Sequence, residues 1–341
     1  MKSSVFYSKH NQVIEEREIP KCGAHDVLIN VKACGICGTD VHIYEGNPGS
    51  ADVTGPQILG HEFSGIITEV GENVKTLKVG DRVCVDPNMY CGNCTPCRDG
   101  VVHYCENMLS YGVTLDGGFA EYCAVNEKVV YKLGENTSYE QGAMVEPLGC
   151  CLHGIDMCEI KAGDKVVVIG GGMIGLLMVQ LAKLEGASKV ALLEPVQEKR
   201  MVGLKMGADI AIDSINLDAK AELKKAGFDN VNVVIECVGR TQTIEQAIDI
   251  AGYKGIIMMF GLTGPNDTIA VKPFEVFKKE IVLKASFINP CTQQRALDLI
   301  DNARIDVTSM ICEVAGLDKL VEIVSTPALR AKGKYLIDPS K

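Results

Sequence analysis

Four of the 15 cysteines of this chain lie close together in the segment CGNCTPCRDGVVHYC, with the spacing C-x2-C-x2-C-x7-C. Four thiolates at such short spacing can close a tetrahedral zinc site that has no open coordination position. An iron–sulfur cluster is the rival interpretation, but a ferredoxin motif places its fourth cysteine after only three intervening residues and follows it with proline. Here the fourth cysteine comes later and precedes Glu106. Free thiols are a third alternative. The spacing favours a structural zinc ion held by Cys91, Cys94, Cys97 and Cys105.

A second set of potential metal ligands is spread over the segments CGICGTDVH (34–42), LGHEFSG (59–65) and MVEPLGCCLHG (144–154). Cys37, His61 and a carboxylate would offer sulfur, nitrogen and oxygen donors that leave one zinc position open, as catalytic zinc requires. Either residue alone would be more simply explained as a satisfied core residue. Their combination in a chain that also carries a nucleotide-binding motif favours a reactive metal site.

That nucleotide-binding motif is VVVIGGGMIG (166–175), in which G-x-G-x-x-G follows an apolar strand and opens a helix. The glycines permit a tight turn and let the backbone and the helix N-terminus approach a pyrophosphate. The next strand, KVALLE, ends in Glu194, whose carboxylate can accept bonds from ribose hydroxyls and would repel a 2′-phosphate. NAD is therefore favoured over NADP, although Lys199 and Arg200 nearby are of a type that can contact a phosphate. The expected cofactor contacts are Gly170, Gly172, Met173, Ile174, Gly175, Glu194, Gly261, Ser286 and Phe287.

Two kinds of segment are expected to position these residues. Up to about residue 150, short strand-like runs such as 27–33, 63–71 and 81–85 alternate with turns and predict an irregular, mostly β domain. From Ile160 onward apolar strands alternate with amphipathic helices, which predicts βαβ units and a doubly wound parallel sheet. The tail is expected to return to the first domain. The predicted α/β architecture has a catalytic domain of residues 1–149 and 289–341, with the cysteine lobe at about 87–110, and a Rossmann domain of residues 150–288.

Composition narrows the classes of partner. The chain has 341 residues, of which 47% are apolar and 23% charged, and its net charge is -10. That charge disfavours nucleic acid as a partner. No apolar run is long enough to cross a bilayer, and the first residues lack a signal-peptide core, so we expect a cytoplasmic protein without membrane contact. An odd number of cysteines argues against a disulfide framework.

The stretch Gly60-His61-Glu62-x2-Gly65-x5-Gly71-x2-Val74 resembles the zinc-site signature of the zinc-dependent medium-chain alcohol dehydrogenases. The CGTDVH run, the cysteine lobe, DGGFAEY (116–122), the VEP segment and GGGMIG follow in the order of that family, over essentially the whole chain. The sequence is most similar to the polyol (sorbitol-type) and threonine dehydrogenase branch. The resemblance implies a GroES-like catalytic domain, two zinc ions per chain, and a homodimer or homotetramer.

The resemblance also implies residue roles. Cys37, His61 and Glu62 would hold the catalytic zinc, and Glu146 would be a direct ligand or bond to the zinc water. Thr39 and His42 would form a proton relay for a hydride transfer from the carbinol carbon to the nicotinamide. Asp40 would orient the histidine ligand, a role with a general physical basis. Lys199 would help to hold the adenosine ribose.

The substrate is expected to be a small secondary alcohol, oxidised in the manner of an NAD(P)-dependent alcohol dehydrogenase (EC 1.1.1.-). Sorbitol-type enzymes typically carry an arginine near the end of the nucleotide domain, where this chain has KASFINP (284–290). A polyol, a diol or a related small hydroxylated substrate is expected, and a short diol, a secondary alcohol or a hydroxy acid is favoured over a long polyol. A threonine dehydrogenase-like reaction is an alternative. A phosphorylated or sulfonated alcohol is a further alternative, although no arginine cluster demands one. Candidate residues lining the pocket are Tyr44, Tyr111 and Phe287.

Two rival functions make different predictions. A non-catalytic NAD-binding regulator that retained the fold would have lost a catalytic zinc ligand, and none is missing from the sequence. An iron–sulfur electron carrier fused to a Rossmann domain would absorb visible light, whereas two zinc ions would be colourless.

Overall fold

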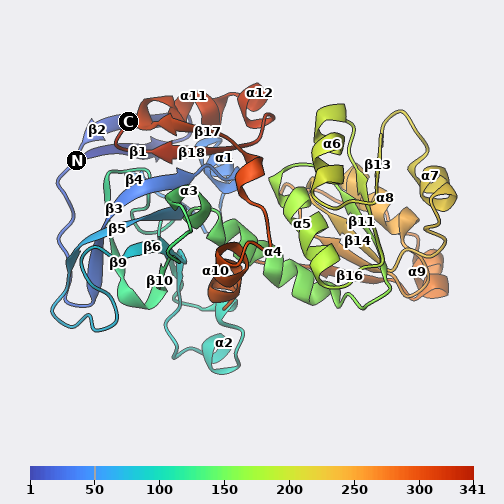
Figure 1. The fold of residues 1–341 in the computed structure, drawn as a ribbon, viewed down its shortest axis with the longest axis horizontal. Coiled ribbons are helices and arrows are strands. Elements are labelled where there is room, and N and C mark those ends of the chain that lie inside the picture. Colours follow the sequence, from blue (N-terminus) through green and yellow to red (C-terminus); the bar gives the residue numbers. More distant parts are fainter. Residues whose placement is uncertain (50) are drawn as a thin grey trace. The chain divides into compact units, whose positions relative to one another are not determined.

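The structure is a computed structural model that describes residues 1–49 and 51–341. It divides into two compact units, Met1–Gly149 with Ile288–Lys341, and Cys150–Phe287 (Figure 1). The second unit ends one residue before the predicted boundary at 288.

The first unit is built on a seven-stranded, largely antiparallel sheet with the order β10-β6-β5-β3-β18-β17, and β9 also pairs with β3. The C-terminal tail returns to this sheet, because β18 pairs with β3 through Leu336 opposite Gly35. The strands of this sheet are β3 (Asp26–Gly35), β5 (Glu62–Val70), β6 (Arg82–Val85), β9 (Tyr122–Asn126), β10 (Val130–Lys132), β17 (Ile311–Gly316) and β18 (Lys334–Asp338).

A three-stranded sheet of order β2-β1-β4 and the short pair β7-β8 complete the β structure described for this unit. Its core contains Phe63 and Phe119, which are fully buried. The remaining strands are β1 (Lys2–Ser8), β2 (Asn11–Glu16), β4 (Gln57–Ile58), β7 (Asn88–Met89) and β8 (Leu109–Ser110). The helices are α1 (Gly38–Tyr44), α2 (Thr95–Arg98), η1 (Val102–Tyr104), η2 (Glu127–Val129), α3 (Tyr139–Gly142), α10 (Gln293–Asp301), η3 (Thr308–Met310), η4 (Leu317–Lys319), α11 (Leu320–Ser325) and α12 (Pro327–Arg330).

The second unit holds a six-stranded parallel sheet of order β13-β12-β11-β14-β15-β16. Numbered from its own first strand this order is 3-2-1-4-5-6, that of the dinucleotide-binding Rossmann fold. The predicted doubly wound parallel sheet is confirmed. Its strands are β11 (Lys165–Ile169), β12 (Lys189–Leu193), β13 (Ile210–Ile212), β14 (Val233–Glu236), β15 (Ile256–Met259) and β16 (Val282–Ala285), and its helices are α5 (Met173–Leu184), α6 (Gln197–Lys205), α7 (Ala219–Lys225), α8 (Thr241–Ile250) and α9 (Pro273–Lys279). Helix α4 (Val145–Cys158) contains the boundary between residues 149 and 150.

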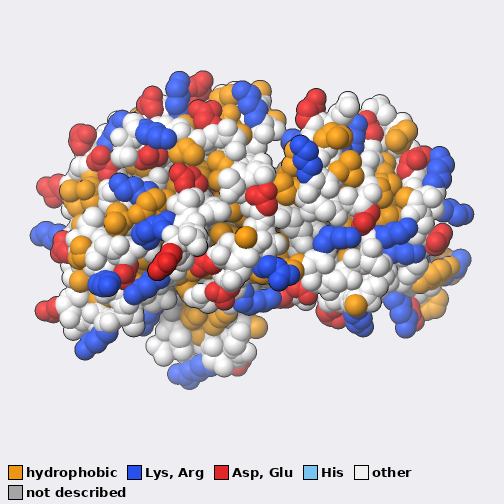
Figure 2. All heavy atoms as spheres, in the orientation of Figure 1, with side chains coloured by type: hydrophobic (Ala, Val, Ile, Leu, Met, Phe, Trp, Pro, Cys, Tyr) orange, Lys and Arg blue, Asp and Glu red, His pale blue; other side chains and the backbone are white. Residues whose placement is uncertain are grey.

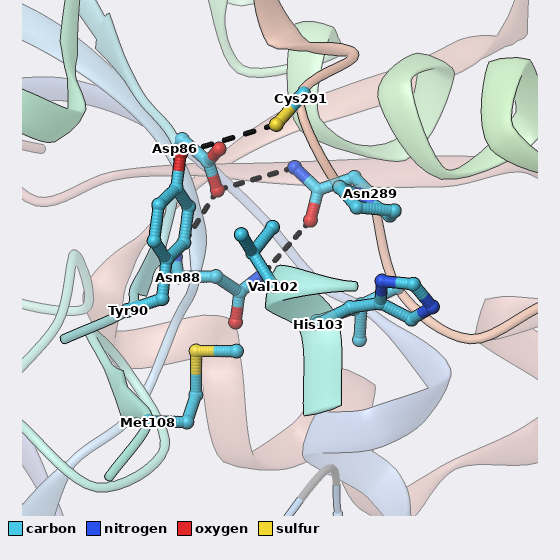
Figure 3. Close-up of a pocket in the computed structure, with 10 residues that line it drawn as sticks. Asp86, Asn88, Tyr90, Val102, His103, Met108, Asn289 and Cys291 are labelled. Atoms are coloured by element: carbon cyan, nitrogen blue, oxygen red, sulfur yellow. Dashed lines mark hydrogen bonds between the residues drawn. The ribbon is translucent and has the colours of Figure 1, made fainter. Parts of the chain in front are cut away.

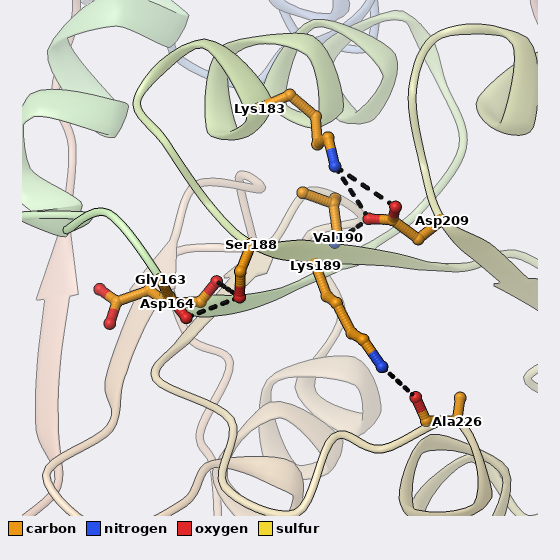
Figure 4. A network of polar contacts seen from close by, with 8 residues as sticks. All are labelled: Gly163, Asp164, Lys183, Ser188, Lys189, Val190, Asp209 and Ala226. Atoms are coloured by element: carbon orange, nitrogen blue, oxygen red, sulfur yellow. Dashed lines mark hydrogen bonds and ion pairs between the residues drawn. The ribbon is translucent and has the colours of Figure 1, made fainter.

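Local contacts fix the start of β12, the strand that carries Glu194 at its far end. Lys183 Nζ lies 3.1 and 3.3 Å from the carboxylate oxygens of Asp209, and Asp209 also accepts the Val190 N–H at 2.6 Å (Figure 4). The Ser188 hydroxyl donates to the carbonyl of Gly163 at 2.6 Å. With its beginning held in this way, β12 stays in register with β11 from Lys165 opposite Lys189 onward.

The surface shown in Figure 2 carries basic and acidic side chains interspersed, in keeping with the modest excess of acidic residues. Among the described residues, no helix combines the length and the apolar character needed to cross a membrane.

Candidate functional site

Three predicted zinc ligands converge in the first unit. Three ligand atoms lie within 4.8 Å of one another, one from each of the side chains of Cys37, His61 and Glu62. The pairing of β3 with β5 explains this, because Gly35 stands opposite Glu62 in the sheet. Cys37 follows two residues after the end of β3 and caps α1, while His61 immediately precedes β5. The sheet register therefore brings together residues 24 positions apart.

Asp40 links two of these ligands. One carboxylate oxygen, Oδ2, accepts the backbone N–H of Cys37 at 2.8 Å, and Oδ1 lies 3.7 Å from His61 Nδ1. Asp40 is 1% exposed, and this burial raises the pKa of its carboxyl group. The nearby His61 acts in the opposite direction and lowers part of that increase. A carboxylate placed against the outer nitrogen of a histidine ligand fixes the orientation of the ring.

The donor set fits a zinc ion. Glu62 Oε1 is buried without a hydrogen-bond partner among the described residues, and an unpaired buried polar atom of this kind is costly unless something binds it. Burial lowers the pKa of His61, but Asp40, Cys37 and Glu146 outweigh it and raise that pKa well above its ordinary value. A concentration of anionic groups around one imidazole is the environment in which a divalent cation is stabilised.

Glu146 stands in the first turn of α4 and is buried. Its charge acts on His61, so it lies in the same electrostatic environment. It does not belong to the group of three whose ligand atoms lie within 4.8 Å. A direct or water-mediated bond from Glu146 to the metal stays a prediction.

Lys334 is a member of this site that sequence reasoning missed. Its ammonium forms an ion pair with Glu62 Oε2 and donates to the carbonyl of Ile36 at 2.9 Å. Both partners of the ion pair are buried. Lys334 is the first residue of β18, almost 300 positions beyond Ile36, and nothing in the local sequence distinguishes it from an ordinary strand-end lysine.

The four cysteines of the lobe also converge, with their sulfur atoms within 4.8 Å of one another. Cys91 Sγ accepts the N–H groups of Asn93 and Cys94, each at 3.4 Å. Cys105 Sγ accepts the N–H groups of Cys91 and Asn107 at 3.3 and 3.4 Å. The hydrogen bonds from Asn93 and Cys94 lower the pKa of Cys91 to about 6, which favours its thiolate, whereas burial raises the pKa of Cys97 to about 12. Four converging sulfur atoms, two of which accept backbone N–H groups, fit a closed zinc site.

The glycine turn of the second unit has the expected conformation. Gly170 adopts φ of 102°, and a Cβ on Gly175 would lie 1.8 Å from the Gly170 carbonyl oxygen. Gly172 caps α5, and a Cβ there would meet nothing within 4 Å. The turn therefore leaves open space at the N-terminus of α5, where a pyrophosphate could approach.

Glu194 lies beside that turn. Its Oε2 accepts the Gly171 N–H at 2.6 Å, and its Oε1 accepts the Val196 N–H at 2.8 Å. Arg200 is occupied by other partners: it donates to the carbonyls of Glu194 and Pro195 at 2.8 and 2.7 Å and pairs with Asp213. Lys199, on α6, is partly exposed. The arginine that the sequence left as a phosphate candidate is thus held by the protein itself.

A buried carboxylate, Glu236, also escaped sequence reasoning. At the end of β14 it accepts the N–H groups of Val238 and Gly239 and the hydroxyl of Thr243. The Gly261 N–H donates to the Glu236 backbone carbonyl at 2.9 Å, and a Cβ on Gly261 would lie 2.1 Å from Gly239 N. Glu236 and Gly261 thus hold together the loops that follow β14 and β15.

The remaining predicted residues of the first unit lie on α1 and in the core. Thr39 and His42 lie on α1, and both are partly buried. Tyr44 and Tyr111 pack in the core of the first unit, where the Tyr111 hydroxyl accepts the Asn126 N–H at 2.9 Å. Their lining of a substrate pocket stays a prediction.

Ser286 and Phe287 follow directly after β16, at the end of the second unit. Ser286 Oγ is buried without a hydrogen-bond partner among the described residues, and Phe287 is 40% exposed. Their contact with the cofactor stays a prediction.

A small cavity of about 10 Å³ lies beside the lobe rather than at the metal cluster (Figure 3). Its volume suits at most one water molecule. Asp86 accepts the Asn88 N–H and the Asn289 side-chain amide on one wall, while Asn88 donates to Asn289 at 2.7 Å. This buried network ties the returning chain at Asn289 to the strand that precedes the lobe.

Replacing Asp86 with asparagine should change how stability depends on pH. Burial raises the pKa of Asp86 from 3.8 to about 6, so between about pH 4 and 6 the folded protein retains a proton that the unfolded chain has lost. Because of Asp86, the free energy of unfolding therefore decreases as the pH rises from about 4 to about 6. The Asp86→Asn variant should lack that decline. The difference in the free energy of unfolding between variant and wild type should therefore shift in favour of the variant by on the order of 3 kcal/mol from about pH 4 to about pH 6. Urea titrations across the window measure the difference.

Asp81→Asn is the matched control. Burial acts to raise the pKa of Asp81, but the ion pair with Lys132 and the backbone N–H and charge of Lys78 together outweigh burial and lower that pKa. The contribution of Asp81 to stability is therefore lost as pH falls, so the two variants should differ from the wild type in opposite directions. A common pH dependence in Asp86→Asn and wild type would contradict the prediction.

A chain with a three-donor metal cluster in one unit and a dinucleotide-binding turn in the other has the parts of a metal-dependent dehydrogenase. Comparison with known proteins confirms this class. Residues 23–135 match the alcohol dehydrogenase GroES-like domain, and residues 173–303 match the zinc-binding dehydrogenase domain. The chain belongs to the zinc-dependent medium-chain alcohol dehydrogenases, in their polyol and threonine dehydrogenase branch. The resemblance inferred from the sequence is therefore confirmed.

Individual relatives match over most of their length. D-arabinitol dehydrogenase 1 of Uromyces fabae is 32% identical over 99% of this chain and 97% of its own. The L-threonine 3-dehydrogenase of Caldanaerobacter subterraneus is 37% identical over 86% of this chain and 83% of its own. A crystal structure of a zinc-binding dehydrogenase from Sinorhizobium meliloti bound to NADP is 38% identical, with a TM-score of 0.94 over 99% of both chains.

Proposed function

We propose that this chain is an NAD-dependent dehydrogenase of a small secondary alcohol, with a catalytic and a structural zinc ion. The observation that carries the proposal is the convergence of Cys37, His61 and Glu62 around Asp40, in a chain with a Rossmann glycine turn. A non-catalytic regulator would not need to keep all three metal donors together.

Different residues of the chain would have different roles in the reaction. When bound, zinc supplies a Lewis acid that makes a substrate hydroxyl easier to deprotonate, and the nicotinamide accepts a hydride. Asp40 holds His61 in orientation and fixes the backbone of Cys37. Thr39 and His42, three positions apart on α1, would pass the hydroxyl proton toward solvent.

The NAD preference rests on Glu194. Its carboxylate is buried next to Gly171 in the glycine turn, where a 2′-phosphate would meet negative charge. Arg200, one of the two nearby basic residues that could contact a phosphate, is bonded to Asp213 and two carbonyls. The S. meliloti relative is bound to NADP, so coenzyme choice in this family has to be decided residue by residue.

Replacing Glu194 with glutamine should weaken the discrimination against NADP. Loss of one charged hydrogen-bond acceptor, worth roughly 1.5–3 kcal/mol, predicts that the ratio of kcat/KM for NAD to that for NADP falls by about 10- to 100-fold. Glu198→Gln, which removes an exposed charge from the start of α6, should leave the ratio unchanged. An unaltered ratio in Glu194→Gln would remove this residue from coenzyme selection.

Short substrates are favoured over long polyols. The relatives include a dehydrogenase of the polyol arabinitol and a threonine dehydrogenase. Their named substrates share a secondary hydroxyl group, so the relatives indicate the reacting group rather than the length of the substrate. Ser286 and Phe287 stand where sorbitol-type enzymes typically carry an arginine, so a short diol, a secondary alcohol or a hydroxy acid is the proposed substrate. A phosphorylated or sulfonated alcohol is the second candidate.

The test is NAD+ reduction, followed by NADH absorbance, over a panel of diols, short polyols, threonine-like hydroxy acids and phosphorylated alcohols. Zinc analysis of the same preparation should return two ions per chain. Zinc-loaded protein that reduces neither NAD+ nor NADP+ with any of these alcohols would overturn the proposal.

We further propose a homodimer or homotetramer in the cytoplasm. Exposed Phe274 and Phe277 on α9, with Val282 and Leu283 on the edge strand β16, support self-association. The odd number of cysteines, 15, argues against a disulfide framework, which suits a reducing compartment. Light scattering of the purified protein measures the oligomeric state.

A further inference from the structure

Glu62 has two inequivalent carboxylate oxygens. Oε2 is engaged by the ammonium of Lys334, which is itself held by the Ile36 carbonyl. Oε1 is buried and has no hydrogen-bond partner among the described residues. Because Glu62 belongs to the three-donor cluster, a single carboxylate is shared between a fixed lysine and the place where the metal would bind.

The backbone beneath this ion pair is shaped to accommodate it. A Cβ on Gly35 would lie 2.1 Å from Glu62 Oε2 and 2.9 Å from Lys334 Cε. The carboxylate and the lysine stem therefore occupy the space that any larger residue at position 35 would need. The pair is built into the sheet at the point where β3 meets both β5 and β18.

Lys334 also contributes charge to the site as a whole. Its positive charge acts on Glu62, Cys37 and Asp40, and all three lie close to or within the metal cluster. In a buried site such interactions are only weakly screened by solvent. Lys334 and a divalent cation therefore compete for the negative charge of Glu62 and repel each other.

We propose that Lys334 is a positioning residue that keeps Glu62 a weak, displaceable metal ligand. This inference rests on the proposed zinc-dependent function. By taking part of the charge of Glu62, Lys334 prevents the carboxylate from closing the coordination position that a substrate hydroxyl needs. The C-terminal strand β18 thus controls how tightly the catalytic metal is held, at a distance of 272 residues along the chain from Glu62.

The proposal predicts opposite changes in two properties when the charge of Lys334 is removed. Lys334→Gln keeps a group that can donate to the Ile36 carbonyl but lacks the ammonium. Zinc release to a chromogenic chelator should slow by about 10- to 100-fold in the catalytic-site phase, the range over which residues behind metal ligands alter affinity. Alcohol oxidation should fall at the same time. A lysine that only stabilised the fold would, when lost, speed zinc release.

The zinc-release experiment on Lys334→Gln has controls within the same protein. Zinc release from the four-cysteine lobe gives a second phase that should not change. Lys319→Gln, which breaks an exposed pair with Glu322 at 3.1 Å in the same unit, should leave both phases unchanged. Lys334→Arg retains the charge and should restore release close to the wild-type rate. Lys334→Met serves as a second neutral variant if Lys334→Gln yields too little folded protein.

The decisive comparison is made in a Glu62→Gln background. There the Lys334→Gln substitution should change the catalytic-phase rate by less than about twofold, because the proposed effect acts through the Glu62 carboxylate. Faster or unchanged zinc release in Lys334→Gln, or an equal effect of that substitution in the Glu62→Gln background, overturns the proposal. Zinc release needs no substrate, so this outcome is distinct from failure of the proposed function, in which two-zinc protein oxidises no alcohol.

Discussion

Replacing Cys37 with alanine is expected to reduce alcohol oxidation by about a thousandfold or more. The thiolate is one of three donors within 4.8 Å, and two donors hold zinc poorly. A metal acting as a Lewis acid contributes several kcal/mol to transition-state stabilisation, and each 1.36 kcal/mol is about a factor of ten in rate. Zinc content should fall from two ions to one. Steady-state kinetics and metal analysis on the same preparation measure both effects.

Cys22→Ala is the matched control for this variant. Cys22 is a partly exposed thiol of the same unit and donates to the Asp26 carbonyl, away from the metal cluster. It should retain activity and both zinc ions. NADH binding, measured by its fluorescence, should survive in Cys37→Ala because the glycine turn lies in the other unit. Full activity of Cys37→Ala with bound NAD would refute the assignment of the catalytic metal.

Replacing Cys97 with alanine is expected to unfold the lobe without removing the catalytic metal. Structural zinc binds zinc-finger peptides with roughly 10–16 kcal/mol, and in small metal sites this energy is folding energy. The lobe contains one trypsin site, Arg98, at the end of α2. Cleavage there should accelerate by a factor on the order of 10² or more, because local opening no longer has to break four metal bonds. Mass spectrometry of a trypsin time course detects the two fragments.

Cys97→Ala and Cys37→Ala serve as controls for one another, because each removes a ligand of a different zinc site. Cys97→Ala and Cys37→Ala should each lose one zinc ion, but only the first should become sensitive to trypsin at Arg98. Cys37→Ala should cleave at the wild-type rate. Iron and a visible absorption band in the wild-type protein, in place of zinc, would contradict the structural-zinc assignment and favour the electron-carrier alternative.

Much of the architecture could be predicted because it follows local rules. Continuous apolar runs such as 166–169, followed by a glycine turn and a helix, specify a buried parallel strand and a phosphate-binding loop. The structure places β11 and α5 there and orders the six strands as a Rossmann sheet. The short strands of the first half could also be predicted, since β3, β5 and β6 include or closely overlap the expected runs.

The metal donors were identified less directly. Spacing alone is sufficient for the four lobe cysteines, because residues a few positions apart must stay close. Cys37 and His61 were connected by residue type and by family resemblance, since no local rule says that two distant glycine-rich turns meet. Their convergence depends on the β3–β5 register, which sets Gly35 opposite Glu62.

The sequence by itself determined the fold class, the glycine turn, the lobe and the types of metal donor, because each is encoded within one short segment. The tertiary structure decided which charges face those donors. Lys334 comes from the last strand and meets Glu62 only because the tail returns to pair with β3. Arg200 is held by Asp213 rather than left free for a phosphate. These ion-pair partners meet because strands that are far apart in the chain pair with one another. The energies of the ion pairs depend on how deeply the side chains are buried, which a short stretch of sequence does not specify.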